Sequence, residues 1–357
     1  MARRTRIGVI GSGYWGPNLI RNFIELPESH VVAVADLDQE RLDGIRQRFP
    51  QVDTTTQNYR DLFEMNLDGV VIATPPFTHH AIARECLEHG LHTLIEKPIT
   101  LNSVDAYDLK QLADQRGLAL MVGHTFEYNP AVRFLKELID SGELGEIHYV
   151  DAVRVSLGLY QTRANVLWDL APHDISILRY ILDAEPVTVC AQGTCCVYEG
   201  VEDIVYAMLR FPGNVLAHMR LSWLDPRKTR QITVVGSKKM VIYDDVAALE
   251  KIKIYDKRVK AIPHNETFGD FSFAYHYGDL VIPHIQHKEP LRAECQHFLE
   301  CIVEGKQPLS DGYSGLRVVK ILEAAQASLE DHGRLVPIDT DGKVPAGVAT
   351  RLELVNG

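Results

Sequence analysis

The sequence predicts an α/β fold of two domains, an N-terminal parallel α/β domain and a C-terminal α+β domain with an open, largely antiparallel sheet. Three observations predict it. Strand-like and helix-like segments alternate up to about residue 123, as in parallel α/β units. Beyond that point strand-like segments follow one another directly. The chain has 357 residues, enough for two domains of about 100–200 residues each.

Short apolar runs and amphipathic segments define the elements of the first domain, residues 1–123. Residues 70–73 form a continuous apolar run, which is expected of a strand covered on both faces. Asn102 and Ser103 precede a periodic segment, as residues at a helix start do. The expected strands are 6–10, 31–36, 69–74, 92–96 and 118–122, and the expected helices are 16–25, 38–48, 79–89 and 103–116.

Residues rich in β-branched side chains and broken by turns define the second domain, residues 124–357. The sequence FPGN at 211–214 predicts a hairpin turn. Residues 250–288 show no clear period, and two interpretations stay open: a loop over an active site or a partner surface. The expected strands are 146–156, 187–198, 203–211, 215–223, 230–236 and 239–243, and the expected helices are 130–140, 168–182, 290–304 and 314–330.

Charge and composition exclude several classes of protein. The net charge of −11 repels nucleic acid and anionic membranes, so neither is expected as a partner. Apolar runs stay well short of the about 20 residues of a membrane span. The six cysteines form no Cys-x-x-Cys or zinc-like spacing, and we expect no metal. Small buried thiols in a reducing compartment are the better interpretation, so a cytoplasmic location is expected.

The stretch RIGVIGSGYWG at 6–16 predicts a dinucleotide site. Gly11, Gly13 and Gly16 give the spacing G-x-G-x-x-G between a buried strand and a helix. Glycine permits the tight turn, the approach of a pyrophosphate and the packing of the helix, whose N-terminus then faces the phosphates. The next strand ends in Asp36, 20 positions after Gly16, and its carboxylate can accept a hydrogen bond from a ribose hydroxyl. An Asp here favours NAD, because it repels the 2′-phosphate of NADP.

Two further motifs carry reactive side chains. Lys97 closes the apolar segment LIEKP, at the strand end where ligands of open α/β sheets bind; a surface lysine beside a proline turn is the other interpretation. Asp169 and His173 are four residues apart, so they share one face of a helix, although Pro172 fits only near a helix start. A histidine satisfied inside the core remains the alternative for His173.

These motifs together resemble the glucose–fructose oxidoreductase and inositol dehydrogenase family (Gfo/Idh/MocA). The resemblance covers nearly the whole chain and implies a Rossmann domain followed by a substrate-binding and oligomerisation domain. It implies an NAD(P)-dependent oxidoreductase acting on CH–OH groups of a carbohydrate. The Lys97–Pro98 peptide is then expected to be cis. The matching segments are GSGYWG at 11–16, ATPPFTHH at 73–80, EKP at 96–98, residues 123–147, the D-x-x-x-H at 169–173 and residues 289–308.

The resemblance also assigns site residues. The catalytic residues are Lys97, His173 and Asp169. Tyr128, Asn129, Arg163 and Asn165 are expected to contact the substrate together with His173. The cofactor is NAD, and the residues expected to bind it are Gly11, Gly13, Tyr14, Trp15, Gly16, Asp36, Thr74, Pro75, His79, Glu96 and Lys97.

The segment GYWGPNLIRNF at 13–23 narrows the expected class of substrate further. It is similar to family members acting on nucleotide sugars in surface-polysaccharide biosynthesis. A secondary hydroxyl, at C3 of a UDP-N-acetylhexosaminuronate for example, is the expected reacting group. Lys97 or His173 would take its proton. A free lysine has a pKa of about 10.4, so a lysine base near neutrality costs roughly 3–4 kcal/mol. Within the segment 225–230, Arg227, Lys228 and Arg230 could grip a diphosphate or carboxylate, but an ordinary solvated turn is the better interpretation.

Three alternatives remain for the function. One is an inositol or simple-sugar dehydrogenase, or a 3-ketoreductase of deoxysugar synthesis, with the same fold and site. The second is a regulator that binds dinucleotide without turnover, which would not need Lys97, Asp169 and His173 together. The third, a metal hydrolase, lacks a metal-ligand spacing. A homodimer or homotetramer is expected.

Overall fold

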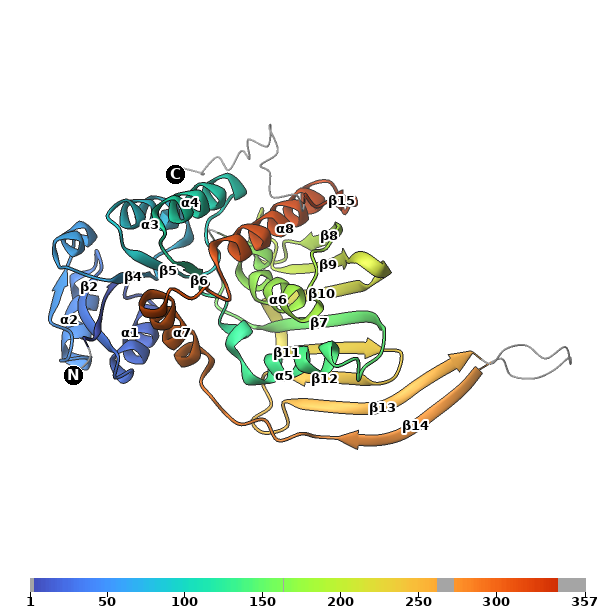
Figure 1. Ribbon diagram of the computed structural model, residues 1–357. Coiled ribbons are helices and arrows are strands. Elements are labelled where there is room, and N and C mark those ends of the chain that lie inside the picture. Colours follow the sequence, from blue (N-terminus) through green and yellow to red (C-terminus); the bar gives the residue numbers. More distant parts are fainter. Residues whose placement is uncertain (1–2, 163, 262–272, 340–357) are drawn as a thin grey trace, which may run out of the picture. The chain divides into compact units, whose positions relative to one another are not determined.

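The chain folds into two compact units in the computed structural model, which describes residues 3–162, 164–261 and 273–339 (Figure 1). The first unit comprises Met1–Thr125, Glu289–Glu323 and Asp339–Gly357, and the second comprises Phe126–Lys288 and Ala324–Ile338. Residues 289–323 therefore belong to the first unit, whereas the sequence-based division placed them in the second domain. Within the described residues, no helix has the length and apolar character needed to cross a membrane.

A six-stranded parallel sheet forms the centre of the first unit, in the strand order β3-β2-β1-β4-β5-β6. The chain order reverses between β1 and β4, and ligands of such sheets bind at the carboxyl ends of the strands beside this point. All four residues of β4 are buried, as the apolar run at 70–73 predicts. The strands are β1 (Thr5–Ile10), β2 (Ser29–Ala35), β3 (Thr54–Thr56), β4 (Gly69–Ile72), β5 (His92–Ile95) and β6 (Leu120–Val122).

Helices connect these strands, and residues 289–323 add helix α7 and the first part of helix α8. The α4 helix begins after Asn102, whose side chain accepts a hydrogen bond from the Asp105 N–H, so the predicted helix start is confirmed. The helices are α1 (Gly16–Glu25), α2 (Gln39–Arg48), η1 (Tyr59–Glu64), η2 (Pro76–Thr78), α3 (His79–Glu88), α4 (Ser103–Arg116), α7 (Pro290–Glu304) and α8 (Gly312–Glu330), of which α8 continues into the second unit.

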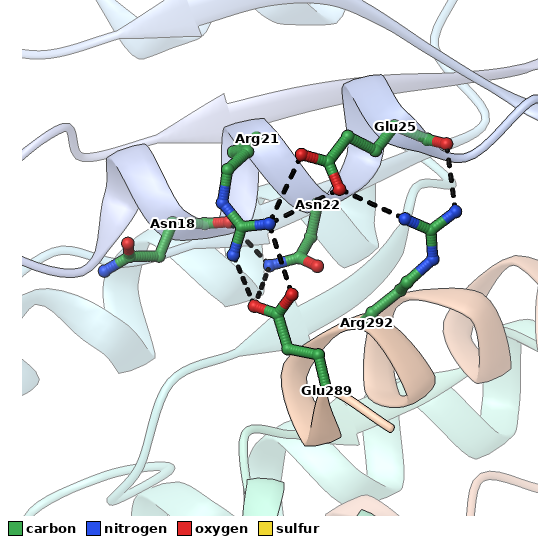
Figure 2. A network of polar contacts seen from close by, with 6 residues as sticks. All are labelled: Asn18, Arg21, Asn22, Glu25, Glu289 and Arg292. Atoms are coloured by element: carbon green, nitrogen blue, oxygen red, sulfur yellow. Dashed lines mark hydrogen bonds and ion pairs between the residues drawn. The ribbon is translucent and has the colours of Figure 1, made fainter. Parts of the chain in front are cut away.

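The α7 helix packs against α1 through both apolar and charged side chains. The Phe23 and Phe298 rings meet edge to face with centroids 6.4 Å apart, and both residues are buried. At the rim, Arg21 pairs with Glu289, and Arg292 donates to the Glu25 carboxylate at 3.1 Å (Figure 2). These contacts fix the helix that begins at the glycine motif.

The second unit is built on a nine-stranded sheet in the order β14-β13-β12-β11-β7-β10-β9-β8-β15. All neighbouring pairs are antiparallel except β7 and β10, which are parallel, so the predicted open, largely antiparallel sheet is confirmed. The strands are β7 (Ile147–Leu157), β8 (Thr188–Thr194), β9 (Ile204–Arg210), β10 (Leu216–Ser222), β11 (Leu224–Gly236), β12 (Met240–Asp244), β13 (Ile252–Ala261), β14 (Phe273–Val281) and β15 (Val336–Pro337).

Helices α5 (Pro130–Asp140) and α6 (Val166–Leu182) pack on one face of this sheet (Figure 1). Burial alternates along β9, where Val205, Ala207 and Leu209 are buried while Tyr206 and Met208 are exposed. A period of two with one face covered is typical of an antiparallel sheet. The opposite face is therefore open among the described residues.

Candidate functional site

The glycine motif forms a sharp turn between β1 and α1. Gly11 has a φ of +97°, and a Cβ there would lie 2.7 Å from the Ala73 carbonyl oxygen. A Cβ on Gly16 would lie 2.2 Å from the Gly11 carbonyl oxygen, so the helix starts in direct contact with the turn. At Gly13 the ideal Cβ has no neighbour closer than the Arg41 guanidinium at 3.6 Å. The backbone itself therefore requires glycine at positions 11 and 16.

The N-terminus of α1 has the features of a phosphate site. Its N-cap residue, Trp15, makes no capping hydrogen bond with its side chain. Pro17 has no N–H and the Asn18 N–H donates to the Trp15 carbonyl at 2.9 Å, so the Gly16 N–H is the first-turn donor that can meet an anion. Tyr14 is exposed beside this turn, and Trp15 is half-buried. The turn, the close helix packing and the uncapped N-terminus fit a dinucleotide pyrophosphate.

Asp36 follows β2 and links its loop to the glycine motif. One carboxylate oxygen accepts from the Ser12 N–H at 2.6 Å and the Ser12 hydroxyl at 2.9 Å, and the other accepts from the Asp38 N–H at 2.9 Å. A carboxylate has about four lone-pair sites, so acceptor capacity remains for a ribose hydroxyl. The Arg41 Nη1 lies 3.9 Å from the carboxylate and places a cation beside it.

His79 joins the loops that follow β4 and β5. Its Nε2 lies 2.8 Å from the Thr74 carbonyl oxygen and its Nδ1 lies 2.9 Å from the Pro98 carbonyl oxygen. Burial lowers the pKa of this imidazole. Thr74 also accepts a hydrogen bond from the Thr78 hydroxyl at 2.7 Å, while Pro75 is exposed. Both ring nitrogens thus lie next to carbonyl oxygens, and the His79 side chain links the two loops; its contact with NAD stays a prediction.

Glu96 and Lys97 stand at the carboxyl end of β5, and the Lys97–Pro98 peptide is cis, as predicted. The Lys97 N–H donates to the Glu96 carboxylate at 3.3 Å. A Cβ on Gly123 would lie 3.0 Å from that carboxylate, so Gly123 leaves the space it occupies. Burial raises the pKa of Glu96 to about 7, although the positive charge of Lys97 opposes this. A desolvated carboxyl group therefore adjoins the half-buried lysine.

Asp169 and His173 are the fourth and eighth residues of α6. The helix begins after Asn165, so Pro172 lies in its second turn, further inside than the sequence analysis allowed. The Trp223 indole N–H donates to the Asp169 carboxylate at 3.0 Å, and the Trp223 side chain is buried. The spacing of four residues in one helix places Asp169 and His173 on one face, as predicted.

The His173 ring packs on an aromatic and ionic cluster that the sequence analysis did not identify. Its ring centre is 5.1 Å from that of Phe126. The Arg154 guanidinium lies 4.6 Å from the centre of the Phe126 ring and donates to the buried Asp174 carboxylate at 2.7 and 2.9 Å. Two features of the sequence could have indicated this cluster: a cation, Arg154, at an inward-facing position of β7, and an acid, Asp174, within the apolar helix α6.

The predicted substrate residues have structural partners. Asn129 caps α5 by accepting from the Ala131 N–H at 2.9 Å, and Tyr128 is buried. Asn165 caps α6 and donates to Glu202 at 2.7 Å. Their contacts to substrate stay predictions. Arg163 lies outside the described residues.

The basic segment 225–230 forms part of β11. Arg227 and Lys228 are exposed, and Arg230 lies 3.6 Å from the Asp245 carboxylate. No group of three or more His, Cys, Asp or Glu side chains suited to a metal is found in the part of the chain that the structure describes.

Two family descriptions match the chain. An oxidoreductase family with an NAD-binding Rossmann fold matches residues 5–124, and the GFO/IDH/MocA C-terminal domain matches residues 132–242. The chain belongs to the GFO/IDH/MocA oxidoreductase family. The predictions of a Rossmann domain, of the cofactor NAD and of oxidoreductase activity are thereby confirmed.

The similarity to several known proteins extends over most of the chain. UDP-N-acetylglucosamine 3-dehydrogenase of Acidithiobacillus ferrooxidans is 26% identical, covering 91% of this chain and 97% of its own. Its solved structure has a TM-score of 0.76, at 24% identity over 93% of this chain and 99% of that one. Myo-inositol 2-dehydrogenase of Thermotoga maritima is 24% identical over 91% of this chain and 96% of its own. A protein of gentamicin A biosynthesis, solved with NAD, has a TM-score of 0.79 at 23% identity, covering 95% of this chain and 97% of that one.

Proposed function

We infer that this oxidoreductase transfers hydride between NAD and a secondary hydroxyl of a sugar, at C3 of a nucleotide sugar such as a UDP-N-acetylhexosaminuronate. The observation that carries the reaction type is Lys97 beside the desolvated Glu96 carboxyl, at the strand end of a domain whose glycine turn fits NAD. The relative named UDP-N-acetylglucosamine 3-dehydrogenase supports the substrate class and the carbon.

Oxidation of a secondary alcohol removes a hydride from carbon and a proton from oxygen. When bound, NAD supplies the nicotinamide ring that accepts the hydride or returns it. Lys97, in its uncharged form, would take the proton on Nζ, and the proton would leave from Nζ in the reverse reaction.

His173 would hold the reacting hydroxyl by a hydrogen bond from its imidazole. Its ring is supported by Phe126, which in turn lies against the buried Arg154. Asp169 would orient the substrate or the imidazole, and the hydrogen bond from Trp223 fixes its carboxylate. Side chains held in this way lose little freedom on binding, which favours a productive orientation.

The test follows reduced nicotinamide by its absorbance when the protein meets NAD and candidate substrates. UDP-N-acetylglucosamine and its uronate should be turned over faster than myo-inositol or a simple sugar. The Lys97→Met variant should lose turnover by about 100-fold or more and keep its affinity for NAD, measured separately by titration. Lys306→Met, at an exposed lysine of the same unit, is the matched control and should retain activity.

The outcomes separate the alternatives. Near-normal turnover in Lys97→Met would transfer the role of base to His173. Faster turnover of myo-inositol than of the nucleotide sugars would support the alternative that this enzyme is an inositol dehydrogenase. If NAD binds and none of the sugars is oxidised, the regulator becomes the better interpretation. Mass spectrometry of small molecules that co-purify with the protein would identify a retained nucleotide sugar directly.

A further inference from the structure

Arg230 lies at the end of the sheet face that helices α5 and α6 cover. It is directly opposite Arg154 in the antiparallel pair of β11 and β7, so the two side chains project from the same face. Ile232 and Val234, two and four positions further along β11, project from this face as well and are buried. The exposed fraction of the Arg230 side chain is 37%. A cation that solvent can reach therefore follows the apolar core on this face.

A short series of contacts joins this position to the proposed catalytic histidine. The Arg154 guanidinium lies 4.6 Å from the centre of the Phe126 ring, and the centre of that ring lies 5.1 Å from that of His173. Opposite residues of an antiparallel pair have Cα atoms about 4.5–5.5 Å apart, so the Arg230 side chain starts on the strand next to Arg154. A ligand that meets His173 therefore comes close to Arg230 in the same unit.

The Arg230 guanidinium keeps its hydrogen-bond donors available. Toward the described residues its side chain donates no hydrogen bond, and its ion-pair partner is the Asp245 carboxylate at 3.6 Å, beyond hydrogen-bond distance. That carboxylate accepts instead from the Tyr243 hydroxyl at 3.0 Å. Arg154, in contrast, donates twice to Asp174, at 2.7 and 2.9 Å. A guanidinium carries several N–H donors, and those of Arg230 can serve a ligand.

The charges around Arg230 favour an anionic group on that ligand. The chain has a net charge of −11, so an anionic substrate needs a local cation to bind. Arg154 and Asp174 neutralise each other, which leaves the loosely paired Arg230 to attract the anion. A planar guanidinium matches a carboxylate through two parallel hydrogen bonds.

The position of the acid group within the substrate favours a carboxylate over a phosphate. In a sugar acid the carboxylate is attached to the same ring as the reacting hydroxyl. The diphosphate of a nucleotide sugar lies outside that ring. When His173 holds the hydroxyl, the carboxylate is therefore the anionic group that comes nearer to the histidine and to Arg230.

We propose that Arg230 binds the carboxylate of a sugar-acid substrate and makes the enzyme select a uronate over the corresponding neutral sugar. This role rests on the proposed function, because the sugar ring is placed by the contact of its hydroxyl with His173. Hydrogen bonds between charged groups of this kind correspond to about 10- to 100-fold in affinity.

Steady-state kinetics with UDP-N-acetylglucosamine and with its uronate test this, with reduced nicotinamide followed by absorbance. The wild-type protein should have the higher kcat/KM for the uronate. Arg230→Gln should lower kcat/KM for the uronate about 10- to 100-fold and change that for UDP-N-acetylglucosamine by less than about twofold. Arg230→Lys keeps the charge and loses the planar group, so its loss should be smaller. Arg210→Gln, at an exposed arginine of β9, is the matched control and should change neither value.

Titration of the uronate into the complex of the protein with NADH measures the same contact without turnover. Arg230→Gln should weaken this affinity by a similar factor and leave the affinity for NADH unchanged. Circular dichroism verifies that each variant is folded. If Arg230→Gln does not fold, Arg230→Lys takes its place, and its loss must again be confined to the uronate.

The outcomes separate the role of Arg230 from the proposed function. An equal loss for both nucleotide sugars would assign Arg230 to the diphosphate and overturn the inference, and so would an unchanged ratio of the two kcat/KM values in a folded variant. A wild-type protein that oxidises UDP-N-acetylglucosamine as fast as the uronate overturns it whether or not the variants fold. If the wild type binds NADH and oxidises neither nucleotide sugar, the proposed function fails, and the role of Arg230 fails with it.

Discussion

Replacing Glu96 with glutamine should raise stability, and only above mildly acidic pH. The pKa of this carboxyl is raised from 4.5 to about 7, chiefly by burial. Between these two values the unfolded chain releases the proton while the folded chain keeps it. The folded state therefore binds more protons in this window, and the free energy of unfolding falls as pH rises through it. Above about pH 7 the cost of the buried charge is fully present.

The size of the effect follows from the difference between the two pKa values. One pKa unit corresponds to about 1.4 kcal/mol, so the wild-type protein loses roughly 3 kcal/mol between about pH 4.5 and 7 through this group. Glu96→Gln keeps an acceptor for the Lys97 N–H and removes the titration. The variant should match the wild type near pH 4.5 and exceed it by up to roughly 3 kcal/mol at pH 8.

Urea unfolding followed by circular dichroism at several pH values measures this difference. Glu64→Gln removes an exposed carboxylate of the same unit and corrects for any general effect of lost charge. A difference in stability between Glu96→Gln and the wild type that does not change with pH, or that grows as the pH falls, would refute the raised pKa of Glu96.

Three further changes test other parts of the two units. Asp36→Ser should reduce the preference for NADH over NADPH, because a repulsive carboxylate is lost beside the cation of Arg41; an unchanged ratio of dissociation constants would contradict this. Asp174→Asn should destabilise the protein by about 3–5 kcal/mol, because it leaves the Arg154 guanidinium buried without its counter-charge, and thermal unfolding would detect this. Trp223→Phe removes the donor to Asp169 while keeping a large ring, so kcat should fall about tenfold with NAD affinity unchanged; equal loss of both would point to general misfolding.

The elements with a strong period were predictable from sequence, and those without one were not. The strands and helices predicted for the first domain appear close to their predicted positions, because buried runs such as 69–72 and amphipathic segments such as 16–25 determine them locally; the short strand β3 at 54–56 was missed. β13 and β14 were missed. Apart from His276, every residue of β14 is exposed, so no alternation of buried and exposed residues marks that strand. The basic segment 225–230 was interpreted as a turn, yet it enters β11.

The motif residues could be placed from sequence, but their supporting contacts could not. Gly11 and Gly16 are required by backbone geometry that the spacing itself encodes. The indole that holds Asp169 comes from position 223, far along the chain, and no local pattern reports such a contact. For Asn165 the sequence alone does not separate two roles, because an asparagine just before a helix is as typical of an N-cap as of a substrate contact. In the structure Asn165 caps α6.

The packing of α7 on α1 also affects how the cofactor domain can be made. The ribosome synthesises residues 126–288 before Phe298 exists to cover Phe23. A fragment that stops at residue 125 would expose this apolar surface and would lack Glu289, one of the two carboxylates that pair with Arg21. A shortened polypeptide intended to bind dinucleotide should therefore join residues 289–323 to the N-terminal portion through a short linker, rather than end where the sixth parallel strand does.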